Sequence, residues 1–261
     1  MMQAISSKDN QYLKLARSLQ RKKGRVEHGC FLIEGARLGE EAAAAGLTIR
    51  LAFISAAAEP RARQVAEQLD AAGHPVYELP AHVLAGVSAT ETSQGIILIA
   101  ELPAALPLPL GGHCYALLDA VADPGNVGAI IRSAAAAGVA GLILGPGCAD
   151  AYSPKAVRAA MGGLFRLPLA VAASDEEAYT LARGLNIALY GSAMEGTDIR
   201  DLMPELRQPH LWLLGAEAAG LSAFWRQIAD ALISLPMAAG AESLNVAAAA
   251  AVFFYQSFLR K

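Results

Sequence analysis

The sequence predicts an α/β protein built from two domains. Strand-like and helix-like segments alternate along the chain on both sides of a stretch rich in proline and glycine. That stretch, residues 101–112, contains three prolines and ends in two glycines, which is typical of an interdomain linker. With 261 residues, 54% of them hydrophobic, the chain can bury the cores of both domains. We expect domains at residues 1–100 and 113–261, joined by the linker at 101–112.

The first domain is expected to be a compact α/β unit with a partly parallel sheet. Leu13, Leu15, Ala16 and Leu19 supply most of the apolar positions of its first helix. The short apolar runs that follow have the length of strands. The expected elements are a helix at 10–23, a strand at 31–33, a helix at 37–45, a strand at 51–54, a helix at 61–72, and strands at 76–79 and 96–100.

The second domain is expected to have a mostly parallel sheet with stronger strands. Its expected elements are strands at 114–118, 141–144, 187–190, 211–214 and 233–235, and helices at 128–137, 155–161, 223–228 and 246–259. Three glycine-containing segments, 123–128, 214–221 and 235–246, each lie at or just beyond the end of a predicted strand. Ligands of parallel sheets bind at the carboxyl ends of strands, so these segments are candidates for one site.

Composition excludes several classes of protein. No apolar run reaches the ~18–20 residues of a membrane span, and the first ten residues lack a signal-peptide pattern. The three cysteines and five histidines are scattered, which gives a metal site no support. We expect a cytoplasmic protein that binds no membrane and no metal.

Positive charge is concentrated near the N-terminus although the net charge is −3. Between Lys8 and Arg25 there are seven basic residues and one acidic residue. Such a cluster suits a phosphate backbone, and a solvated helix face explains it equally well. The candidate phosphate contacts in it are Lys8, Lys14, Arg21, Lys22, Lys23 and Arg25.

The first segment combines a turn sequence with an isolated arginine. Asp123-Pro124-Gly125-Asn126 predicts a type II turn. Arg132 follows on a helix made otherwise of Ala, Ile, Ser and Gly. A charge in such surroundings needs an anionic partner or a water-filled cleft. A structural salt bridge is the competing interpretation.

The second and third segments each have a structural and a functional interpretation. Gly215 lets the backbone approach a ligand closely, and Glu217 is either a ribose acceptor, a partner of Arg132 or a helix N-terminal glutamate. Ser243 is expected to cap the last helix, with Asn245 in its first turn. The cap alone explains Ser243 but not the Pro-Met loop that precedes it.

Together these segments resemble the motifs of the SpoU/TrmH family of RNA ribose 2′-O-methyltransferases, in the SPOUT superfamily. The family's Asn-x-Gly-x-x-x-Arg matches Asn126, Gly128 and Arg132, and its Gly-x-Glu-x-x-Gly matches Gly215, Glu217 and Gly220. Its Pro-Met…Ser-Leu-Asn-Val matches Pro236-Met237 and residues 243–246. A Pro-Lys-x-x-Arg segment matches Lys155 and Arg158.

The resemblance implies a fold, a cofactor and roles for individual residues. The second domain would be an α/β knot, with its last segments threaded through a trefoil, and would bind S-adenosylmethionine. The implied catalytic residues are Arg132, Asn126, Glu217, Ser243 and Asn245. The implied cofactor-binding residues are Leu214, Gly215, Gly220, Leu235, Pro236, Met237, Leu244 and Asn245.

The resemblance also implies the substrate and the assembly. Residues 5–7, 10 and 31–35, with Thr92-Ser93-Gln94-Gly95, are similar to the family's substrate-binding extension, which resembles a ribosomal RNA-binding protein. This extension favours 23S rRNA as substrate. The resemblance of the whole chain implies a homodimer, and we take Lys155 and Arg158 of the Pro-Lys-x-x-Arg segment as further RNA contacts. The alternatives are a tRNA 2′-O-methyltransferase and a non-catalytic RNA-binding protein of the same fold; a nucleotide-dependent oxidoreductase lacks its glycine fingerprint.

Overall fold

The computed structural model describes residues 2–5, 7, 9–90, 92–104, 108–217, 219–240 and 243–260. Its internal contacts divide the chain into two compact units. The first unit comprises residues 1–104 together with 150–165, and the second comprises 105–149 together with 166–261. Among the described residues no helix is long and apolar enough to cross a membrane.

The first unit is a mixed sheet with helices on both faces. Its strands are β1 (Gln3–Ala4), β2 (Cys30–Glu34), β3 (Ile49–Ser55), β4 (Val76–Leu79) and β5 (Ile96–Glu101), in the order β1-β4-β3-β5-β2. β4 pairs in parallel with β1 and β3, whereas β5 pairs antiparallel with β3 and β2. The prediction of a partly parallel sheet is therefore confirmed.

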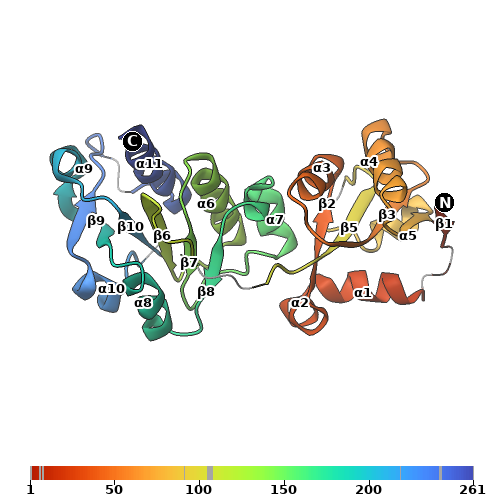
Figure 1. Cartoon of the computed structure of the whole chain (residues 1–261), viewed down its shortest axis with the longest axis horizontal. Coiled ribbons are helices and arrows are strands. Elements are labelled where there is room, and N and C mark those ends of the chain that lie inside the picture. The colour runs from red at the N-terminus through yellow and green to blue at the C-terminus, as the bar shows by residue number, and fades with distance from the viewer. Residues whose placement is uncertain are drawn as a thin grey trace. The chain divides into compact units, whose positions relative to one another are not determined.

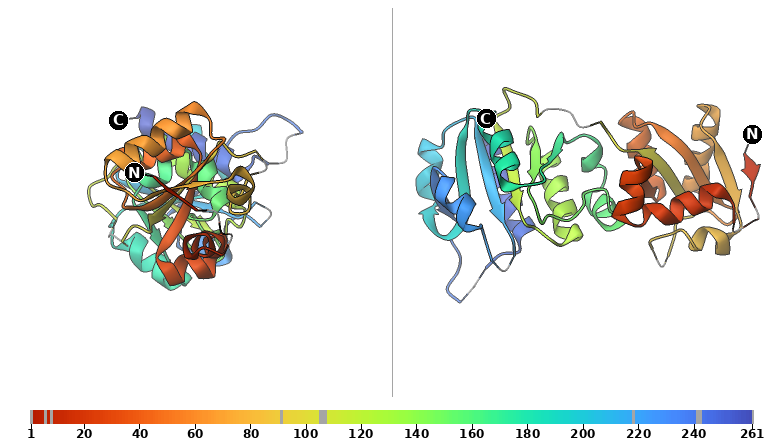
Figure 2. Two further views of the ribbon diagram at one scale, coloured as in Figure 1. Left: turned by 90° about the vertical axis from the view of Figure 1, so that its right-hand side faces the viewer. Right: turned by 90° about the horizontal axis from the view of Figure 1, so that it is seen from below.

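The helices of this unit form two layers. They are α1 (Gln11–Leu19), α2 (Lys22–His28), α3 (Ala36–Ala44), α4 (Pro60–Ala71), α5 (Ala81–Ala85), α7 (Pro154–Ala160) and the 3-10 turn η1 (Gly163–Phe165). α3 and α4 lie on one face of the sheet and α1 on the other, where α1 lies in front of the strands when the unit is seen from below (Figures 1 and 2). Leu13, Ala16 and Leu19 of α1 join the core on that face.

The single helix predicted at 10–23 is two helices. Asn10 caps α1 by accepting a hydrogen bond from the Tyr12 amide, and the extended backbone of Arg21 separates α1 from α2. A β-carbon at Gly24 would lie 2.2 Å from the Ser18 carbonyl oxygen, so glycine permits this close return of the chain. The sequence also gave no signal for the two-residue β1 or the five-residue α5.

The segment 150–165 contributes to the interior of the first unit. Asp150 forms an ion pair of 2.6 Å with Arg25, whose side chain is 4% exposed. Tyr152 packs edge-on against Phe31 with 5.1 Å between ring centroids. The unit is therefore assembled from two separate stretches of chain, a division that alternation of elements does not reveal.

The second unit is a parallel sheet between two helix layers. Its strands are β6 (Cys114–Asp119), β7 (Leu142–Leu144), β8 (Leu169–Val171), β9 (Ala188–Asp198), β10 (His210–Gly215) and β11 (Ala231–Ser234), in the order β11-β9-β10-β6-β7-β8. Every strand pair is parallel. The central strands β6 and β10 are buried throughout, which explains their continuous apolar sequence.

Helices α6 (Pro124–Ala136) and α11 (Val246–Leu259) cover one face, and α8 (Asp175–Arg183) and α10 (Ala223–Ile228) cover the other (Figure 1). The short α9 (Ile199–Leu202) and η2 (Met203–Glu205) follow β9. The bounds predicted for α10 and α11 are confirmed residue for residue.

Two parts of this unit differ from prediction. β9 continues to Asp198, far beyond the predicted 187–190, because polar residues pair with β11 across an irregular register. β8 and the acidic helix α8 were not predicted; β8 is only three residues long, and α8 buries only Ala178 and Ala182. The trefoil knot implied by the resemblance stays a prediction.

Candidate active site

Three loops meet at the carboxyl edge of the parallel sheet in the second unit. β6, β10 and β11 end at Asp119, Gly215 and Ser234, and the three glycine-containing segments follow them. Because the strands are parallel, their carboxyl ends share one edge. The convergence predicted from the sequence is therefore present.

A chain of hydrogen bonds joins one polar side chain from each loop. Nδ2 of Asn126 donates to Oε1 of Glu217 at 2.6 Å. Nδ2 of Asn245 donates to Oδ1 of Asn126 at 3.1 Å. Asn126 uses its amide as both donor and acceptor, so it fixes the two other side chains relative to each other.

Asn126 is held by the start of α6. The predicted type II turn at 123–126 is wrong: Asp123 is the N-cap of α6, its carboxylate accepts from the Asn126 amide at 3.0 Å, and Pro124 is the first helical residue. Proline suits that position because its missing N–H is not needed there. Asn126 therefore lies in the first helical turn, with its side chain half-buried.

Asn245 is held in a similar way at the start of α11. It is the N-cap itself, and its Oδ1 accepts from the amides of Ala247 at 2.9 Å and Ala248 at 3.3 Å. The expectation that Ser243 caps this helix is therefore wrong. Asn245 therefore has two roles: its oxygen caps the helix, and its nitrogen donates to Asn126.

The backbone at Gly215 passes very close to the chain that follows it. A β-carbon at this residue would lie 2.1 Å from the Gly220 carbonyl carbon. Gly220 has a φ of +66° and donates from its amide to the Ala216 carbonyl at 2.8 Å. Both glycines are required by this tight loop, which carries Glu217.

A cavity of about 360 Å³ lies beside these loops. Of the residues predicted to bind a cofactor, Gly215, Gly220, Leu235, Met237 and Leu244 line it, and so do Glu217 and Ser243. Leu214 is buried in β10, and the other predicted cofactor residues, Pro236 and Asn245, do not line the cavity either.

Part of the lining was missed in the sequence. Ser192, Ala193, Met194, Glu195, Arg226, Ile233, Ala249 and Phe253 also border the cavity. Glu195 and Arg226 form an ion pair across β9 and α10. The extension of β9 beyond its apolar part brings residues 192–195 to the cavity, and the apolar pattern gave no sign of that extension.

Arg132 is exposed on the third turn of α6, and the structure shows no ion pair or hydrogen bond to it within the described residues. Its side chain is exposed to solvent and does not line the cavity, so neither the anionic partner nor the structural salt bridge expected for this charge is found among the described residues. Among the described residues no group of three or more His, Cys, Asp or Glu side chains is arranged to hold a metal ion.

The predicted RNA contacts divide into three groups. Lys14, Arg21, Lys22 and Lys23 are exposed on or beside α1 and α2, and Lys8 lies outside the described residues. Arg25 instead is buried, paired with Asp150 and bonded to the Leu19 carbonyl at 2.7 Å, so the structure gives it a structural role. Lys155 is exposed on α7, whereas Arg158 is half-buried and its Nη1 has no hydrogen-bond partner among the described residues.

Known families match both parts of the chain. The SpoU rRNA methylase family matches residues 113–255, and the MRM3-like substrate binding domain matches residues 10–98. A 23S rRNA (guanosine(2553)-2′-O)-methyltransferase of Bacillus subtilis is 32% identical over 254 residues, covering 97% of this chain and 98% of the relative. A 23S rRNA (uridine(2479)-2′-O)-methyltransferase of Streptomyces viridochromogenes is 43% identical over 147 residues, covering 54% of this chain and 50% of the relative.

Solved structures give the same assignment. The SpoU methyltransferase AviRb of Streptomyces viridochromogenes, in complex with AdoMet, is 31% identical with a TM-score of 0.86, covering 96% of this chain and 97% of the other. An AdoMet-bound rRNA methyltransferase of Sinorhizobium meliloti is 31% identical with a TM-score of 0.85, covering 98% and 97%. The chain belongs to the SpoU rRNA methylase family.

Proposed function

We propose that this protein transfers a methyl group from S-adenosylmethionine to a ribose 2′-hydroxyl of 23S rRNA. The observation that carries the proposal is the hydrogen-bond chain Glu217–Asn126–Asn245 beside the cavity, which unites all three family motifs. The names of the relatives agree with it, since those from Bacillus subtilis and Streptomyces viridochromogenes are 23S rRNA 2′-O-methyltransferases.

The residues around the cavity fit S-adenosylmethionine. A volume of about 360 Å³ lies within the range of small-molecule sites. Ile233, Leu235 and Phe253 offer an apolar surface for the adenine ring, while the tight backbone at Gly215–Gly220 brings main-chain polar groups close. Glu217 supplies negative charge for the sulfonium or ammonium group, whereas the charge of Glu195 is balanced by its ion pair with Arg226.

When bound, S-adenosylmethionine supplies the reactive methyl group. The protein contributes alignment and charge. A guanidinium stays protonated in proteins and is a poor base, so Arg132 is not assigned the role of a base. We assign it to orienting the ribose and its phosphate and to stabilising developing negative charge on the 2′-oxygen, with the proton passing to a phosphate oxygen or to water. Asn126, Glu217, Ser243 and Asn245 are assigned to positioning the ribose; within the described residues none of them forms a hydrogen bond or ion pair with Arg132.

The first unit would present the RNA. Lys8, Lys14, Arg21, Lys22 and Lys23, with Lys155 and Arg158, remain the proposed phosphate contacts. The exposed apolar residues of α11, which are Val252, Tyr255, Phe258 and Leu259, support a homodimer that buries them. With ribosomal RNA as substrate, the enzyme would act in the cytoplasm.

The test is methylation of 23S rRNA taken from a strain that lacks the gene. Purified protein with S-adenosylmethionine should add one 2′-O-methyl nucleotide to it, detectable by mass spectrometry of nuclease fragments. Methylation of tRNA instead would favour the tRNA enzyme. Binding of RNA without any methyl transfer and without S-adenosylmethionine binding would favour a non-catalytic protein.

A further inference from the structure

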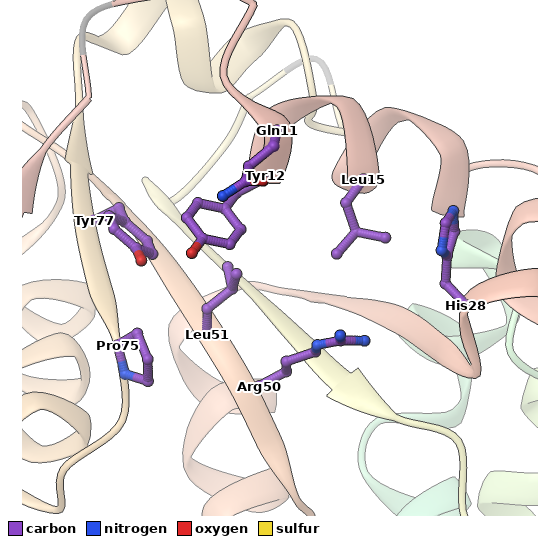
Figure 3. A pocket seen from close by; sticks show the side chains of 8 residues that line it. All are labelled: Gln11, Tyr12, Leu15, His28, Arg50, Leu51, Pro75 and Tyr77. Atoms are coloured by element: carbon purple, nitrogen blue, oxygen red, sulfur yellow. The ribbon is translucent and has the colours of Figure 1, made fainter.

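A second cavity, of about 430 Å³, lies in the first unit, far along the chain from the methyl-transfer motifs. It opens between α1, the end of α2 and the strands β3 and β4 (Figure 3). Gln11, Tyr12, Leu15, His28, Arg50, Leu51, Pro75 and Tyr77 line it. Nothing in the proposed methyl-transfer chemistry requires a cavity at this place.

One wall of this cavity is aromatic. The rings of Tyr12 and Tyr77 are stacked, with 4.9 Å between centroids and 27° between planes. Tyr77 is 9% exposed and belongs to the core, whereas Tyr12 is only half-buried, so Tyr12 carries the accessible part of this wall. The hydrogen bond with Tyr12 and burial raise the pKa of Tyr77 to about 12, so this phenol is neutral under physiological conditions.

The other side of the cavity is polar and basic. Figure 3 shows His28 at the end opposite the tyrosines, with the Arg50 side chain extending toward it. Arg50 is exposed, and its contact within the cavity region is a weak 3.5 Å hydrogen bond from Nη1 to the Cys30 sulfur. Gln11 adds an exposed amide, and no acidic side chain is among the residues that line the cavity in the described structure.

These groups are the ones that bind an unpaired nucleotide. An aromatic face stacks on a base, an amide bonds to a base edge, and a guanidinium bonds to a phosphate. The exposed cations Lys14, Arg21 and Lys22 on the neighbouring helices extend the positive surface beyond the cavity. A neutral metabolite would not use the exposed guanidinium of Arg50, whose electrostatic neighbours within the described residues are Cys30 and Glu101. An acidic peptide would not use the stacking surface.

We propose that this cavity receives one unpaired nucleotide of the RNA substrate, with its base against Tyr12 and its phosphate at Arg50. The inference rests on the proposed function, because it takes RNA to be the substrate. It adds a site that distinguishes single-stranded from double-stranded RNA: a nucleotide held in a duplex cannot enter, so the enzyme selects RNA that has an unpaired nucleotide besides the target.

The first experiment uses the full-length protein and a single-stranded RNA pentamer with 2-aminopurine at its centre. Stacking on Tyr12 should quench the fluorescence. Tyr12→Leu keeps an apolar side chain but removes the ring, and should raise Kd about 5- to 100-fold. The matched control is Tyr179→Leu, a half-buried tyrosine on α8 of the other unit, which should bind the pentamer like the unsubstituted protein.

The second experiment tests Arg50. Arg50→Gln should reduce the slope of log Kd against log salt concentration by about 0.7, as expected when one phosphate contact to a single strand is lost. Arg61→Gln removes an exposed arginine from the opposite helix layer, where it pairs with Glu40, and should leave the slope unchanged.

Calorimetric titration with S-adenosylmethionine, together with thermal unfolding, checks that each variant is folded. Quenching that is absent in the unsubstituted protein, or equal in Tyr12→Leu, overturns the nucleotide site. The unsubstituted protein could also fail to bind S-adenosylmethionine or to methylate RNA and still bind the pentamer through Tyr12. That result overturns the proposed function but supports the nucleotide site.

Discussion

The side-chain amide of Asn126 donates a 2.6 Å hydrogen bond to the carboxylate of Glu217, which lies 91 residues later in the chain. Asn126 also accepts from Asn245, so its amide nitrogen faces Glu217 and its amide oxygen faces Asn245. A residue with acceptors only at this position would lose the bond to Glu217, although Asn245 could still donate to it.

Asn126→Asp should therefore abolish most of the methylation. The new carboxylate would face Glu217 at about hydrogen-bond distance, and repulsion between like charges would displace the two loops. We expect kcat to fall about 100-fold, the usual cost of a small misplacement at a reacting centre. Asn186→Asp, an exposed asparagine with a φ of +52° on the loop after α8, is the matched control and should retain full activity. Equal rates for the two variants would contradict the assignment.

Arg132→Ala should separate catalysis from stability. The side chain is exposed, so the free energy of unfolding should change by no more than about 0.5 kcal/mol. Loss of its charge near the 2′-oxygen should lower kcat about 100- to 1000-fold while RNA binding is retained. Single-turnover methylation and filter binding measure the two effects. Arg183→Ala, an exposed arginine on α8, is the control. Near-full methylation by Arg132→Ala would remove Arg132 from the mechanism.

Two substitutions separate the capping role of Asn245 from its hydrogen bond to Asn126. Asn245→Ala should lose the helix cap, at a cost of about 1 kcal/mol in unfolding free energy, and also lose activity. Asn245→Asp keeps an effective cap but loses the donor to Asn126, so stability should be nearly unchanged while activity falls. Ser174→Ala removes the cap of α8 and should cost stability without activity. Urea unfolding measures the stability of these variants, and methylation rates measure their activity. Full activity in Asn245→Asp would contradict a role for the bond from Asn245 to Asn126.

The Arg25–Asp150 pair should be important for stability. Asp150→Asn leaves a guanidinium that is 4% exposed without its charge partner. Breaking a buried pair in this way costs about 3–5 kcal/mol. Glu40→Gln breaks an exposed pair with Arg61 and should cost no more than about 1 kcal/mol. Urea unfolding compares the free energies of unfolding of the two variants. Equally small losses would show that Arg25 is better hydrated than its burial implies.

His210 should make stability depend on pH. Burial lowers the pKa of His210 from 6.5 to about 4. Its Nδ1 lies 3.1 Å from the Arg207 carbonyl and its Nε2 lies 2.8 Å from the Ser257 hydroxyl, so the neutral ring donates through Nδ1 and accepts at Nε2. At a pH between 4 and 6.5, His210 binds a proton in the unfolded chain but not in the folded chain. The contribution of neutral His210 to the free energy of unfolding is therefore complete above pH 6.5 and is lost as the pH falls toward 4.

The loss should amount to about 3 kcal/mol across that window, since one pKa unit corresponds to about 1.4 kcal/mol. Urea unfolding at several pH values should show a shallower decline for His210→Gln than for the unsubstituted protein. His82→Gln, which changes an exposed histidine on α5, should keep the original decline. Parallel curves for all three proteins would contradict the role of His210.

The sequence predicted most of the sheet because its strands are apolar runs of ordinary length. It predicted α10 and α11 at their observed bounds. It missed the polar end of β9, since those residues pair through their backbone and show no apolar pattern. It also merged α1 and α2, because the break depends on the close approach at Gly24 rather than on a proline or a loop.

For the site, the motifs predicted which loops would meet but not how their side chains connect. A serine ahead of an apolar helix is an ordinary cap, and only the observed bonds show that Asn245 takes that position. Arg25 belonged to a run of basic residues, and its pairing with Asp150 across 125 positions of sequence could not be deduced from that run. Tyr12 and Tyr77 gave no signal because their stacking joins a helix to a strand far along the chain.

The distance in sequence between Arg25 and Asp150 has a consequence for synthesis. A ribosome releases the chain from its N-terminus, so Arg25 emerges well before its counter-ion exists. Until residue 150 has left the exit tunnel, closing the core around Arg25 would bury an unbalanced charge. The N-terminal unit must therefore complete its folding late, when much of the second unit has already been translated.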